Sequence, residues 1–461
     1  MKNQKAPGLD NLPADVWKLR KLLSTATTWL MAFFNAMVDS GRAPVKWATS
    51  ITVPIFKNKG DPAVCSNYRL IRLLSHTMKI FERIFNQRLR DTVQLSINQC
   101  GFVKGSGTKD AIFAARLLLE KHREKRKPLH VAFLDLEKAF DRVLHQLIWY
   151  ALRDHGVPEL LIDWVRMLYT NANSHVRCPV GTFDSFPVNV GMHQGSALSP
   201  LLFVLVMDTI TRDLQRNVPW TLLYADDLML AAPSREELQQ QVQTEYLETS
   251  LNTGSIQVSG KDLTKTDIFQ HLGSDLQNDG GINGDVRARV NATWIWWREV
   301  AGVLCDKKMP IQLKSKIYRT VVRPVALYGT ECWPATKVAE RRLHAMEMRM
   351  ARWSLGISLL DHIGNDLIRR RMGIAPIDEK MRERRLQWYG HVLRAAPDTV
   401  ASIAYHLEFD GQRPRGRPKQ RWQDTINADI KIIHLCSDDA LDRAKWRSMI
   451  RKADPASAGQ R

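Results

Sequence analysis

Two adjacent acidic residues, Asp226 and Asp227, stand between two short apolar segments, 220–224 and 228–232. This pattern predicts a β-hairpin whose turn presents both carboxylates at one point. A third acid, Asp135, ends another apolar segment. If these segments are neighbouring strands, Asp135 and Asp226 can hold divalent cations, because Mg²⁺ prefers hard oxygen ligands. Taken alone, the acid pair can equally be an ordinary polar turn, since Asp is a common turn residue.

Carboxylates in such an arrangement suit phosphoryl transfer. Two bound metal ions about 4 Å apart activate a hydroxyl nucleophile and stabilise a leaving pyrophosphate. The reaction depends on positioning and charge neutralisation more than on covalent chemistry by the protein. If the segments are neighbours, the acids suit nucleotidyl transfer on two metal ions, and the alternative of a polar turn stays open at this point.

The segments around the acids show both strand and helix patterns, which predicts an α+β fold. Strands are expected at 51–56 and 129–136, and a strand–turn–strand at 174–190 with its turn at Gly181. Helices are expected at 15–42, 76–89, 143–155, 158–170 and 198–215. From about residue 282, long helical stretches rich in Arg and Trp follow.

The charge balance is strongly basic. The 461 residues include 67 Lys and Arg against 48 Asp and Glu, a formal net charge of +19. Such a balance favours a polyanionic partner, most often nucleic acid, over the alternative of an unspecialised basic surface. The length predicts two or three domains, and 44% hydrophobic residues suffice for sizeable cores.

The six cysteines include no Cys-x2-Cys pair, so a zinc knuckle is not expected. Scattered cysteines in a long chain predict reduced thiols in an intracellular compartment, the cytoplasm and the nucleus. The N-terminus lacks an apolar signal core, and the run 201–207 is too short to span a membrane. No membrane association is expected.

Five motifs follow one another along the chain. They occupy residues 67–75, 99–110, 133–141, 191–203 and 224–227, the last reading Tyr-Ala-Asp-Asp. Their order and spacing resemble the reverse transcriptases of non-LTR (LINE-type) retrotransposons, most closely the RTE-like clade. The resemblance covers nearly the whole chain, and agreement of five ordered motifs is highly specific.

The resemblance implies roles for the acids and for one aromatic residue. Asp135 and Asp226 are expected to bind two Mg²⁺ ions, with Mn²⁺ as a substitute, and Asp227 to support them. Phe140 stands where the family places a steric gate, at which a bulky ring excludes a 2′-hydroxyl. For a lone Phe the alternative, packing in the core, is the commoner role.

The resemblance also implies residues that bind the incoming nucleotide. Gln194 and Gly195 are expected to border it, with glycine allowing close approach of the backbone. Arg69 and Lys57 are expected to contact its triphosphate, because charge-assisted hydrogen bonds to phosphate suit both residue types. The alternative for Lys57 is a solvated lysine in a turn.

A Pro/Gly/Arg-rich loop covers residues 409–421, and its segment 414–419 resembles an AT-hook core. Since RTE-like C-terminal regions carry a similar loop, general nucleic-acid contact is favoured over reading of the A·T minor groove. The residues expected to bind are Arg413, Arg415, Arg417, Lys419 and Arg421. The tryptophans at 294, 296 and 297 could stack on bases, but packing between thumb helices is the preferred interpretation.

Three features depart from the family. Leu70 replaces the usual Pro, and Arg72 the usual Ser. After Gln243 the chain skips part of a helix, a strand and a lysine that is thought to protonate the pyrophosphate or position the triphosphate, as a lost exon or a gene-model error would do. Loss of a general acid typically costs a factor of about 100 to 10,000 in rate. The family's N-terminal endonuclease is also absent, so the chain is not expected to nick target DNA.

The sequence thus predicts an α+β right-hand polymerase with an antiparallel palm sheet. Expected domains are fingers at 1–130, palm at 131–275 and a helical thumb with a basic nucleic-acid-binding region at 276–461, the reverse transcriptase domain covering roughly 40–275. The expected function is RNA-directed DNA polymerisation from an RNA template, a DNA primer and deoxynucleoside triphosphates. The alternative is a degenerate retroelement fragment that only binds nucleic acid, and the sequence does not indicate the oligomeric state.

Overall fold

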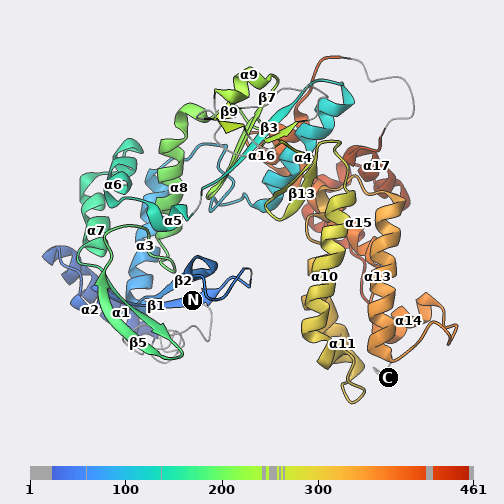
Figure 1. Cartoon of the computed structure of the whole chain (residues 1–461), viewed down its shortest axis with the longest axis horizontal. Helices are drawn as coiled ribbons and strands as arrows, with labels where there is room; N and C mark the ends of the chain where they lie inside the picture. Colours follow the sequence, from blue (N-terminus) through green and yellow to red (C-terminus); the bar gives the residue numbers. More distant parts are fainter. Residues whose placement is uncertain are drawn as a thin grey trace. The chain divides into compact units, whose positions relative to one another are not determined.

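The computed structural model describes residues 23–58, 60–136, 138–240, 246–248, 257–258, 261–262, 265–411 and 419–455 (Figure 1). The chain forms two compact units, each assembled from two separate stretches of sequence. Unit 1 contains Met1–Phe102 and Asp135–Gln215, and unit 2 contains Val103–Leu134 and Arg216–Arg461. The predicted boundaries between fingers, palm and thumb remain predictions.

The strands of unit 1 form a sheet in the order β2-β1-β4-β5. Their bounds are Thr49–Phe56 for β1, Tyr68–Leu73 for β2, Asn173–Cys178 for β4 and Gly181–Pro187 for β5. β1 pairs antiparallel with β2 and parallel with β4. The hydroxyl groups of Thr52 and Ser174 lie 2.6 Å apart across β1 and β4, so both stretches of unit 1 share one sheet.

The helices of unit 1 supply its core. They are α1 Leu23–Ser40, α2 Val45–Ala48, α3 His76–Thr92, α5 Ala139–Arg142, α6 His145–Asp154, α7 Glu159–Tyr169 and α8 Ser199–Ile210, with short 3₁₀ turns η3 Cys65–Asn67 and η4 Arg212–Leu214. α8 is apolar on nearly every side and almost entirely buried, as a central core helix must be. α3 is amphipathic and buries Phe81 and Phe85, whose rings contact Trp164 of α7 at 6.2 and 5.6 Å between centroids.

The main sheet of unit 2 has the order β11-β8-β3-β7-β6. The strands are β3 His130–Asp135, β6 Thr221–Tyr224, β7 Asp227–Ala232, β8 Tyr246–Glu248 and β11 Lys265–Thr266; two further ribbons pair β9 Gln257–Val258 with β10 Lys261–Asp262 and β12 Ile268–His271 with β13 Ser274–Gln277. β8 pairs antiparallel with β3, with Leu247 opposite Val131. β8 therefore covers an edge of β3 although the family's strand is skipped after Gln243; residues 241–245 themselves lie outside the described part.

Helices make up the rest of unit 2. They are α4 Thr108–Glu124, α9 Arg235–Gln239, α10 Asn283–Leu304, α11 Ile311–Ile317, α12 Arg323–Ala326, α13 Lys337–Leu355, α14 Asn365–Met372, α15 Ile377–Arg394, α16 Val400–His406, α17 Trp422–Ile432 and α18 Arg443–Ile450, with the π-helical turn η5 Tyr318–Val322 and 3₁₀ turns η6 Thr330–Cys332 and η7 Asp438–Leu441. Asp285 of α10 is fully buried. Its Oδ2 accepts hydrogen bonds from Arg116 at 2.6 Å, Ser274 at 2.6 Å and Trp333 at 2.9 Å. A buried carboxylate needs such partners, and these three tie α4, β13 and the segment after η6 to α10.

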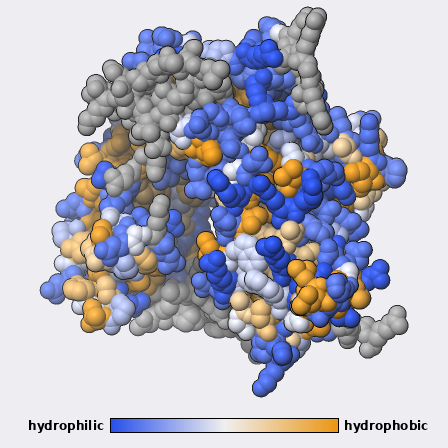
Figure 2. All heavy atoms as spheres, turned by 45° about the vertical axis from the view of Figure 1, so that its right-hand side comes forward, coloured by the Kyte–Doolittle hydropathy of each residue, from blue (hydrophilic) through white to orange (hydrophobic). Residues whose placement is uncertain are grey.

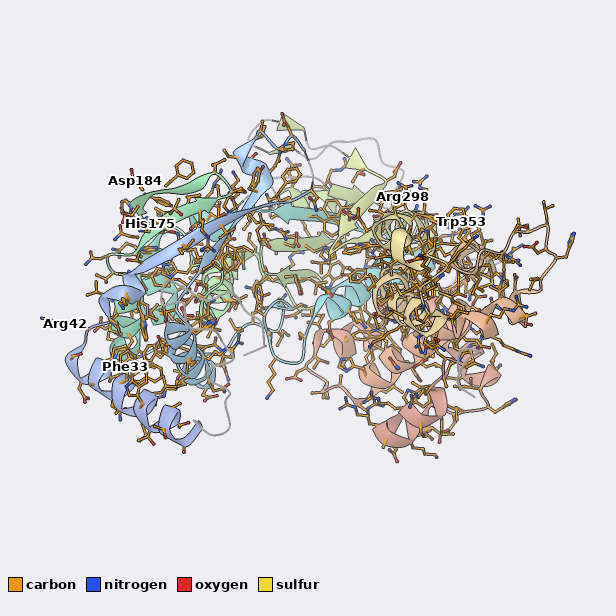
Figure 3. The ribbon with its side chains drawn as sticks, turned by 90° about the horizontal axis from the view of Figure 1, so that it is seen from below. Phe33, Arg42, His175, Asp184, Arg298 and Trp353 are labelled. Carbon is orange, nitrogen blue, oxygen red and sulfur yellow. The ribbon has the colours of Figure 1, made fainter. Side chains whose placement is uncertain are left out.

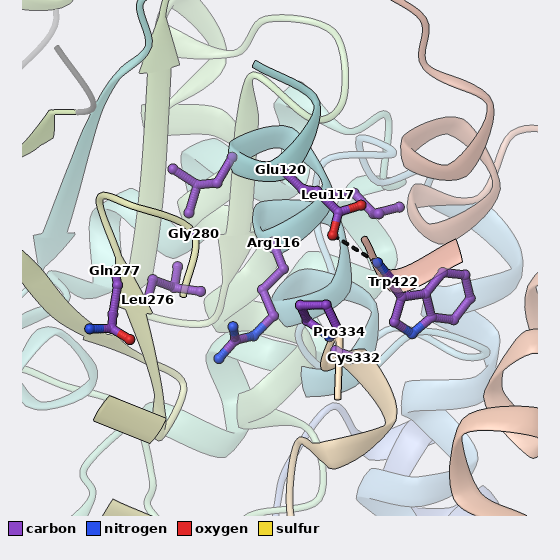
Figure 4. A pocket seen from close by; sticks show the side chains of 10 residues that line it. Arg116, Leu117, Glu120, Leu276, Gln277, Gly280, Cys332, Pro334 and Trp422 are labelled. Atoms are coloured by element: carbon purple, nitrogen blue, oxygen red, sulfur yellow. Dashed lines mark hydrogen bonds between the residues drawn. The ribbon is translucent and has the colours of Figure 1, made fainter. Parts of the chain in front are cut away.

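α4 is the helix to which much of unit 2 attaches. It begins where the amide of Gly107 donates to Oδ2 of Asp110, at 2.9 Å. Near its other end, Oε2 of Glu120 accepts from the amide of Trp422 at 2.9 Å (Figure 4). Most of α4 is buried, so its sequence lacks the one-sided periodicity of a surface helix, and no helix is predicted there from the sequence.

The α+β fold class predicted from the sequence is confirmed, with a helical, basic C-terminal part. The strands expected at 51–56 and 129–136 and the acidic hairpin are confirmed, as are the helices expected at 76–89, 143–155, 158–170 and 198–215, with ends that differ by a few residues. The helix expected at 15–42 is α1 over its described part. Within the described residues, no helix is both long and apolar enough to cross a membrane.

Candidate active site

The acidic hairpin is a tight turn between β6 and β7. Tyr224 pairs with Asp227, which leaves Ala225 and Asp226 as the two turn residues. Ala225 has φ 58°, a left-handed conformation that costs a non-glycine residue energy and that a tight hairpin turn imposes. Both aspartates are half-buried, and the strands beneath them are fully buried in the core. The core thus holds the two carboxylates at one rigid turn.

β3 is the neighbour of β7 in the sheet. Asp135 is the last residue of β3 and Asp227 the first residue of β7. The condition set from the sequence, that the two acidic segments be neighbouring strands, is therefore met. The side chain of Asp135 lies outside the described part of the chain.

The types of side chain at this place fit a divalent metal ion. Asp226 and Asp227 supply carboxylate oxygens, the ligands that Mg²⁺ takes in proteins. Among the described side chains, which exclude that of Asp135, no group of three His, Cys, Asp or Glu residues is arranged to hold a metal ion. The donor chemistry of the two described carboxylates therefore fits a divalent metal ion, and the role of Asp135 as a ligand stays a prediction.

In unit 1, the residues Gln194 and Gly195 form a turn against β2. The amide of Arg72 donates to the carbonyl oxygen of Gln194 at 2.8 Å. The side-chain amide of Gln194 donates to Oδ1 of Asp141 at 2.6 Å. Gly195 has φ +112°, and a Cβ on it would lie 2.6 Å from the carbonyl oxygen of Arg72. This turn therefore needs glycine on two counts.

A protein-family model described as reverse transcriptase (RNA-dependent DNA polymerase) matches residues 56–266. This range contains the acidic hairpin, β3 and the Gln194–Gly195 turn. Residues 56–266 are a reverse transcriptase domain. The family uses divalent metal ions, in agreement with the carboxylate donors.

Relatives of the reverse transcriptase domain come from retrotransposable elements. A Nasonia vitripennis "Retrovirus-related Pol polyprotein from type-1 retrotransposable element R2" is 31% identical over 47% of this chain and 22% of that protein. The "RNA-directed DNA polymerase from mobile element jockey" of Drosophila funebris is 24% identical over 96% of this chain and 51% of that protein. The resemblance to non-LTR retrotransposons is thus confirmed. The chain spans 22%, 32% and 20% of the length of the first three curated relatives.

Among solved structures, telomerase from Candida tropicalis in complex with a TWJ fragment of telomeric RNA aligns with 83% of this chain and 68% of that chain. The identity is 12% and the TM-score 0.38, so no residue role is transferred from it.

The expected triphosphate contacts lie at one end of the β1–β2 ribbon in the reverse transcriptase domain. Arg69 of β2 pairs with Ile55 of β1, and Lys57 follows β1 directly. Both cationic side chains are exposed, and Nζ of Lys57 donates to the carbonyl oxygen of Ser66 at 3.1 Å. Two exposed cations at one end of a ribbon are suited to contact an anion.

Phe140 of α5 is half-buried, and its ring lies 4.6 Å from that of Phe203, measured between centroids. Its carbonyl oxygen accepts from the amide of Met192 at 2.8 Å. The hydrogen bond with Met192 places Phe140 beside the segment that leads to Gln194. The contact with Phe203 agrees with packing in the core, and the expected role of Phe140 as a steric gate stays a prediction.

Glu82 of α3 is a positioning residue that was not predicted from the sequence. Its Oε1 accepts from the hydroxyl of Ser196 at 2.7 Å and its Oε2 from the amide of Ala197 at 2.8 Å. Burial raises the pKa of this carboxyl, and the two hydrogen bonds oppose that shift. The available signal was an acid on the apolar face of an amphipathic helix, between Phe81 and Phe85.

His193, next to Gln194, is also buried and stacks on Tyr169 at 4.3 Å between ring centroids. Burial, and then the positive charge of Arg72, lower the pKa of His193 to about 3. The imidazole is therefore neutral at pH 7 and acts here as a packing group rather than as a cation. The unusual Arg72 of the fingers motif thus lies beside the Gln194 turn.

The basic loop is described only at its end. Arg413, Arg415 and Arg417 lie outside the described residues. Arg421 donates to Glu124 at 3.1 Å and to Asp424 at 2.7 Å, and Lys419 donates to Asp279 at 3.1 Å. Both cations are already paired inside unit 2.

Proposed function

We propose that the chain is an RNA-directed DNA polymerase that extends a DNA primer along an RNA template with deoxynucleoside triphosphates. The acidic hairpin beside β3, within a reverse transcriptase domain, is the observation that supports this most strongly. A rigid turn with two carboxylates next to a strand that ends in a third suits nucleotidyl transfer, which depends on fixed charge.

In this proposal Asp135 and Asp226 hold two Mg²⁺ ions, for which Mn²⁺ can substitute. Bound ions would neutralise phosphate charge and lower the pKa of the primer hydroxyl. Asp227 supports the turn that carries Asp226. The sheet holds the turn that carries Asp226 and Asp227 in place before substrate arrives, so little reorganisation of this turn is needed during reaction.

The incoming nucleotide is assigned to residues of unit 1. Gln194 and Gly195 border it, because the glycine permits close backbone approach and Asp141 orients the glutamine amide. Lys57 and Arg69 pair with its triphosphate, and Phe140 excludes a 2′-hydroxyl by a clash.

The decisive experiment is primer extension on an RNA template by the purified chain with Mg²⁺ and deoxynucleotides. Asp226→Ala removes a charged ligand at the turn and is expected to lower extension by about 100- to 1,000-fold or more. Asp184→Ala changes an exposed aspartate of β5 in unit 1 and is the matched control. Extension by the wild type and control alone supports the proposal.

A different outcome would contradict the proposal. If the wild type does not extend a primer while it and Asp226→Ala bind RNA equally well, the proposal fails. The chain is then a retroelement remnant that binds nucleic acid without catalysis.

A further inference from the structure

A hollow runs between α10 and α13 in unit 2, outside the matched reverse transcriptase domain. It consists of two adjoining parts, of about 370 and 970 Å³, which share Trp294, Ala345 and Arg349. Residues at helical spacing supply one wall from each helix: 287, 290, 291 and 294 on α10, and 342, 345, 346, 349 and 353 on α13. The smaller part therefore lies between two helix faces, while the larger part runs from Trp294 along the end of α13 to the segment 356–359 and Asn365.

Tryptophan side chains make the aromatic part of this groove. Trp294 and Trp353 both line it, with ring centroids 5.4 Å apart and planes inclined by 55°. Trp353 is 56% exposed, whereas Trp297, on another face of α10, is 2% exposed. Packing of thumb helices thus accounts for Trp297 but leaves the ring of Trp353 open to a ligand.

Arginines make its charged part. Arg287, Arg342 and Arg349 line the groove and are exposed, and among the described residues none of their guanidinium groups has a hydrogen-bond or ion-pair partner. Arg342 and Arg349 are separated by two helical turns, about 10 Å along the axis of α13. No acidic residue lines either part of the groove in the described chain.

Unpaired cations spaced along an aromatic surface are the combination that binds single-stranded nucleic acid. Arginines follow the phosphates while aromatic rings stack on successive bases, whose faces are all accessible when unpaired. An acidic peptide would use the charges but not the ring surface, and an apolar partner would leave three guanidinium groups desolvated. Figure 2, which brings the right-hand side of Figure 1 forward, shows hydrophobic patches bordered directly by hydrophilic surface.

We propose that the α10–α13 groove binds an unpaired stretch of RNA through stacking on Trp353 and phosphate contacts of Arg342 and Arg349. The choice of RNA rests on the proposed function, in which the template is RNA. The groove then holds template that has not yet been copied, and it adds affinity for RNA independently of the catalytic acids.

The test uses the full chain and a short fluorescent oligouridylate, with binding measured by anisotropy. Trp353→Ala is expected to weaken binding by about 5- to 100-fold, because loss of a stacked base costs roughly that factor. Trp353→Phe should recover most of the affinity. Trp296→Ala, an equally exposed tryptophan of α10 that does not line the groove, is the matched control and should bind as the wild type.

The salt dependence of RNA binding tests the proposed phosphate contacts of the groove arginines. Arg342→Gln is expected to reduce the slope of log affinity against log salt by about 0.7 for each phosphate that the arginine no longer neutralises. Arg298→Gln, on α10 but outside the groove lining, should leave the slope unchanged (Figure 3 labels Arg298 and Trp353). Thermal unfolding of each variant checks that the change is at an exposed side chain and not in the fold.

Three results would overturn the inference. The first is that Trp353→Ala and Trp296→Ala bind oligouridylate equally well. The others are that Trp353→Ala weakens binding of an RNA–DNA duplex but not of oligouridylate, or that it weakens binding of oligodeoxythymidylate alone. Measurements on Asp226→Ala separate this inference from the proposed function, because this variant should lose primer extension but keep its binding of oligouridylate. If Trp353→Ala weakens binding of oligouridylate but the wild type extends no primer, only the proposed polymerase function is overturned. If the wild type extends a primer but Trp353→Ala binds oligouridylate as the wild type does, only the proposed role of the groove is overturned.

Discussion

At the scale of single residues, the turn at Gln194 and Gly195 is held from three sides. Asp141 binds the glutamine side chain, the amide of Arg72 binds its carbonyl, and Glu82 binds the residues that follow. Glutamine must therefore adopt one orientation. Such a pre-set polar group is what nucleotide recognition needs, because little reorganisation remains to be made on binding.

Gly195→Ala tests this turn. A Cβ would strain the backbone at φ +112° and meet the carbonyl oxygen of Arg72 at 2.6 Å, so the turn must shift. We expect a loss of roughly 1 to 3 kcal/mol of stability and, from misplacement of Gln194, about 100-fold in kcat/KM for primer extension.

The control for this change is Gly156→Ala in the same unit. Gly156 also has a positive φ, +72°, but a Cβ there meets nothing within 4 Å. It should share the loss of stability without the loss of kcat/KM. Equal kinetic effects of both changes would contradict the proposed role of the turn.

At the scale of elements, α4 joins parts of unit 2 through buried polar contacts rather than through apolar packing alone. Glu120 caps the amide of Trp422, and Nζ of Lys121 donates to the carbonyl oxygens of Ala404 and Tyr405 at 3.1 and 2.6 Å. The small cavity beside Glu120 is lined by residues of α4, the β13 ribbon and the segment around η6 (Figure 4). Buried contacts of this kind make the unit sensitive to protonation.

Burial raises the pKa of Glu120 to about 7, and burial also raises that of Glu347 to about 7. Between pH 4.5 and 7 the folded protein therefore binds more protons at these groups than the unfolded chain. The free energy of unfolding must fall as pH rises through that window, by on the order of 1 to 3 kcal/mol for each group.

Glu120→Gln is expected to flatten this dependence. Glutamine has no charge to desolvate, and its carbonyl oxygen can still accept from the amide of Trp422. The melting temperature of the variant at pH 7.5 should equal or exceed that of the wild type, while at pH 4.5 the two should agree. A variant that loses stability equally at both pH values would show that the carboxyl group does not titrate as described.

At the scale of the whole molecule, the net charge of +19 is only partly available to a partner. Arg421, Lys419 and Arg116 pair with acids within unit 2. In the part of the chain that the structure describes, Arg342 and Arg349 have no ion-pair partner. The net charge counted from the sequence therefore overstates the positive charge that the loop 409–421 offers to a nucleic acid. A cation that already pairs with an acid in the folded protein is less available to contact phosphate than one that does not.

The basic loop gives a prediction at this scale. Joint replacement of Arg413, Arg415 and Arg417 by Gln should weaken binding of RNA and reduce its salt slope by about 0.7 for each phosphate that is no longer neutralised. Arg421→Gln should leave the slope unchanged and lower stability by about 1 kcal/mol or less, because it removes the ion pairs of Arg421 with Glu124 and Asp424 near the surface.

Anisotropy titrations at several salt concentrations, with thermal unfolding, distinguish these effects. If Arg421→Gln reduces the salt slope as much as loss of one of the other arginines does, Arg421 must contact phosphate. Its ion pairs with Glu124 and Asp424 would then have to open when RNA binds. Equal slopes for the wild type and the triple variant would remove the loop from the nucleic-acid interface.

The sequence by itself determined the local elements and the family. Short apolar segments on both sides of Asp226 and Asp227 predict the β6–β7 hairpin, and periodicity predicts α3, because these patterns depend only on nearby residues. The five ordered motifs likewise indicate the reverse transcriptase domain without any knowledge of contacts. α4 was missed because polar side chains such as Arg116 and Glu120 are buried among its apolar ones, so the polar positions do not mark an exposed face.

Only the tertiary structure decided which distant residues meet. It places β3 beside β7, brings Glu82 to the turn after Gln194, and pairs Arg421 with Glu124, from the opposite end of unit 2's sequence. Each of these pairings joins residues far apart in the chain, and a local pattern carries no record of its partner. Burial then changes their chemistry, since a carboxyl group such as that of Glu120 titrates according to its surroundings rather than its type.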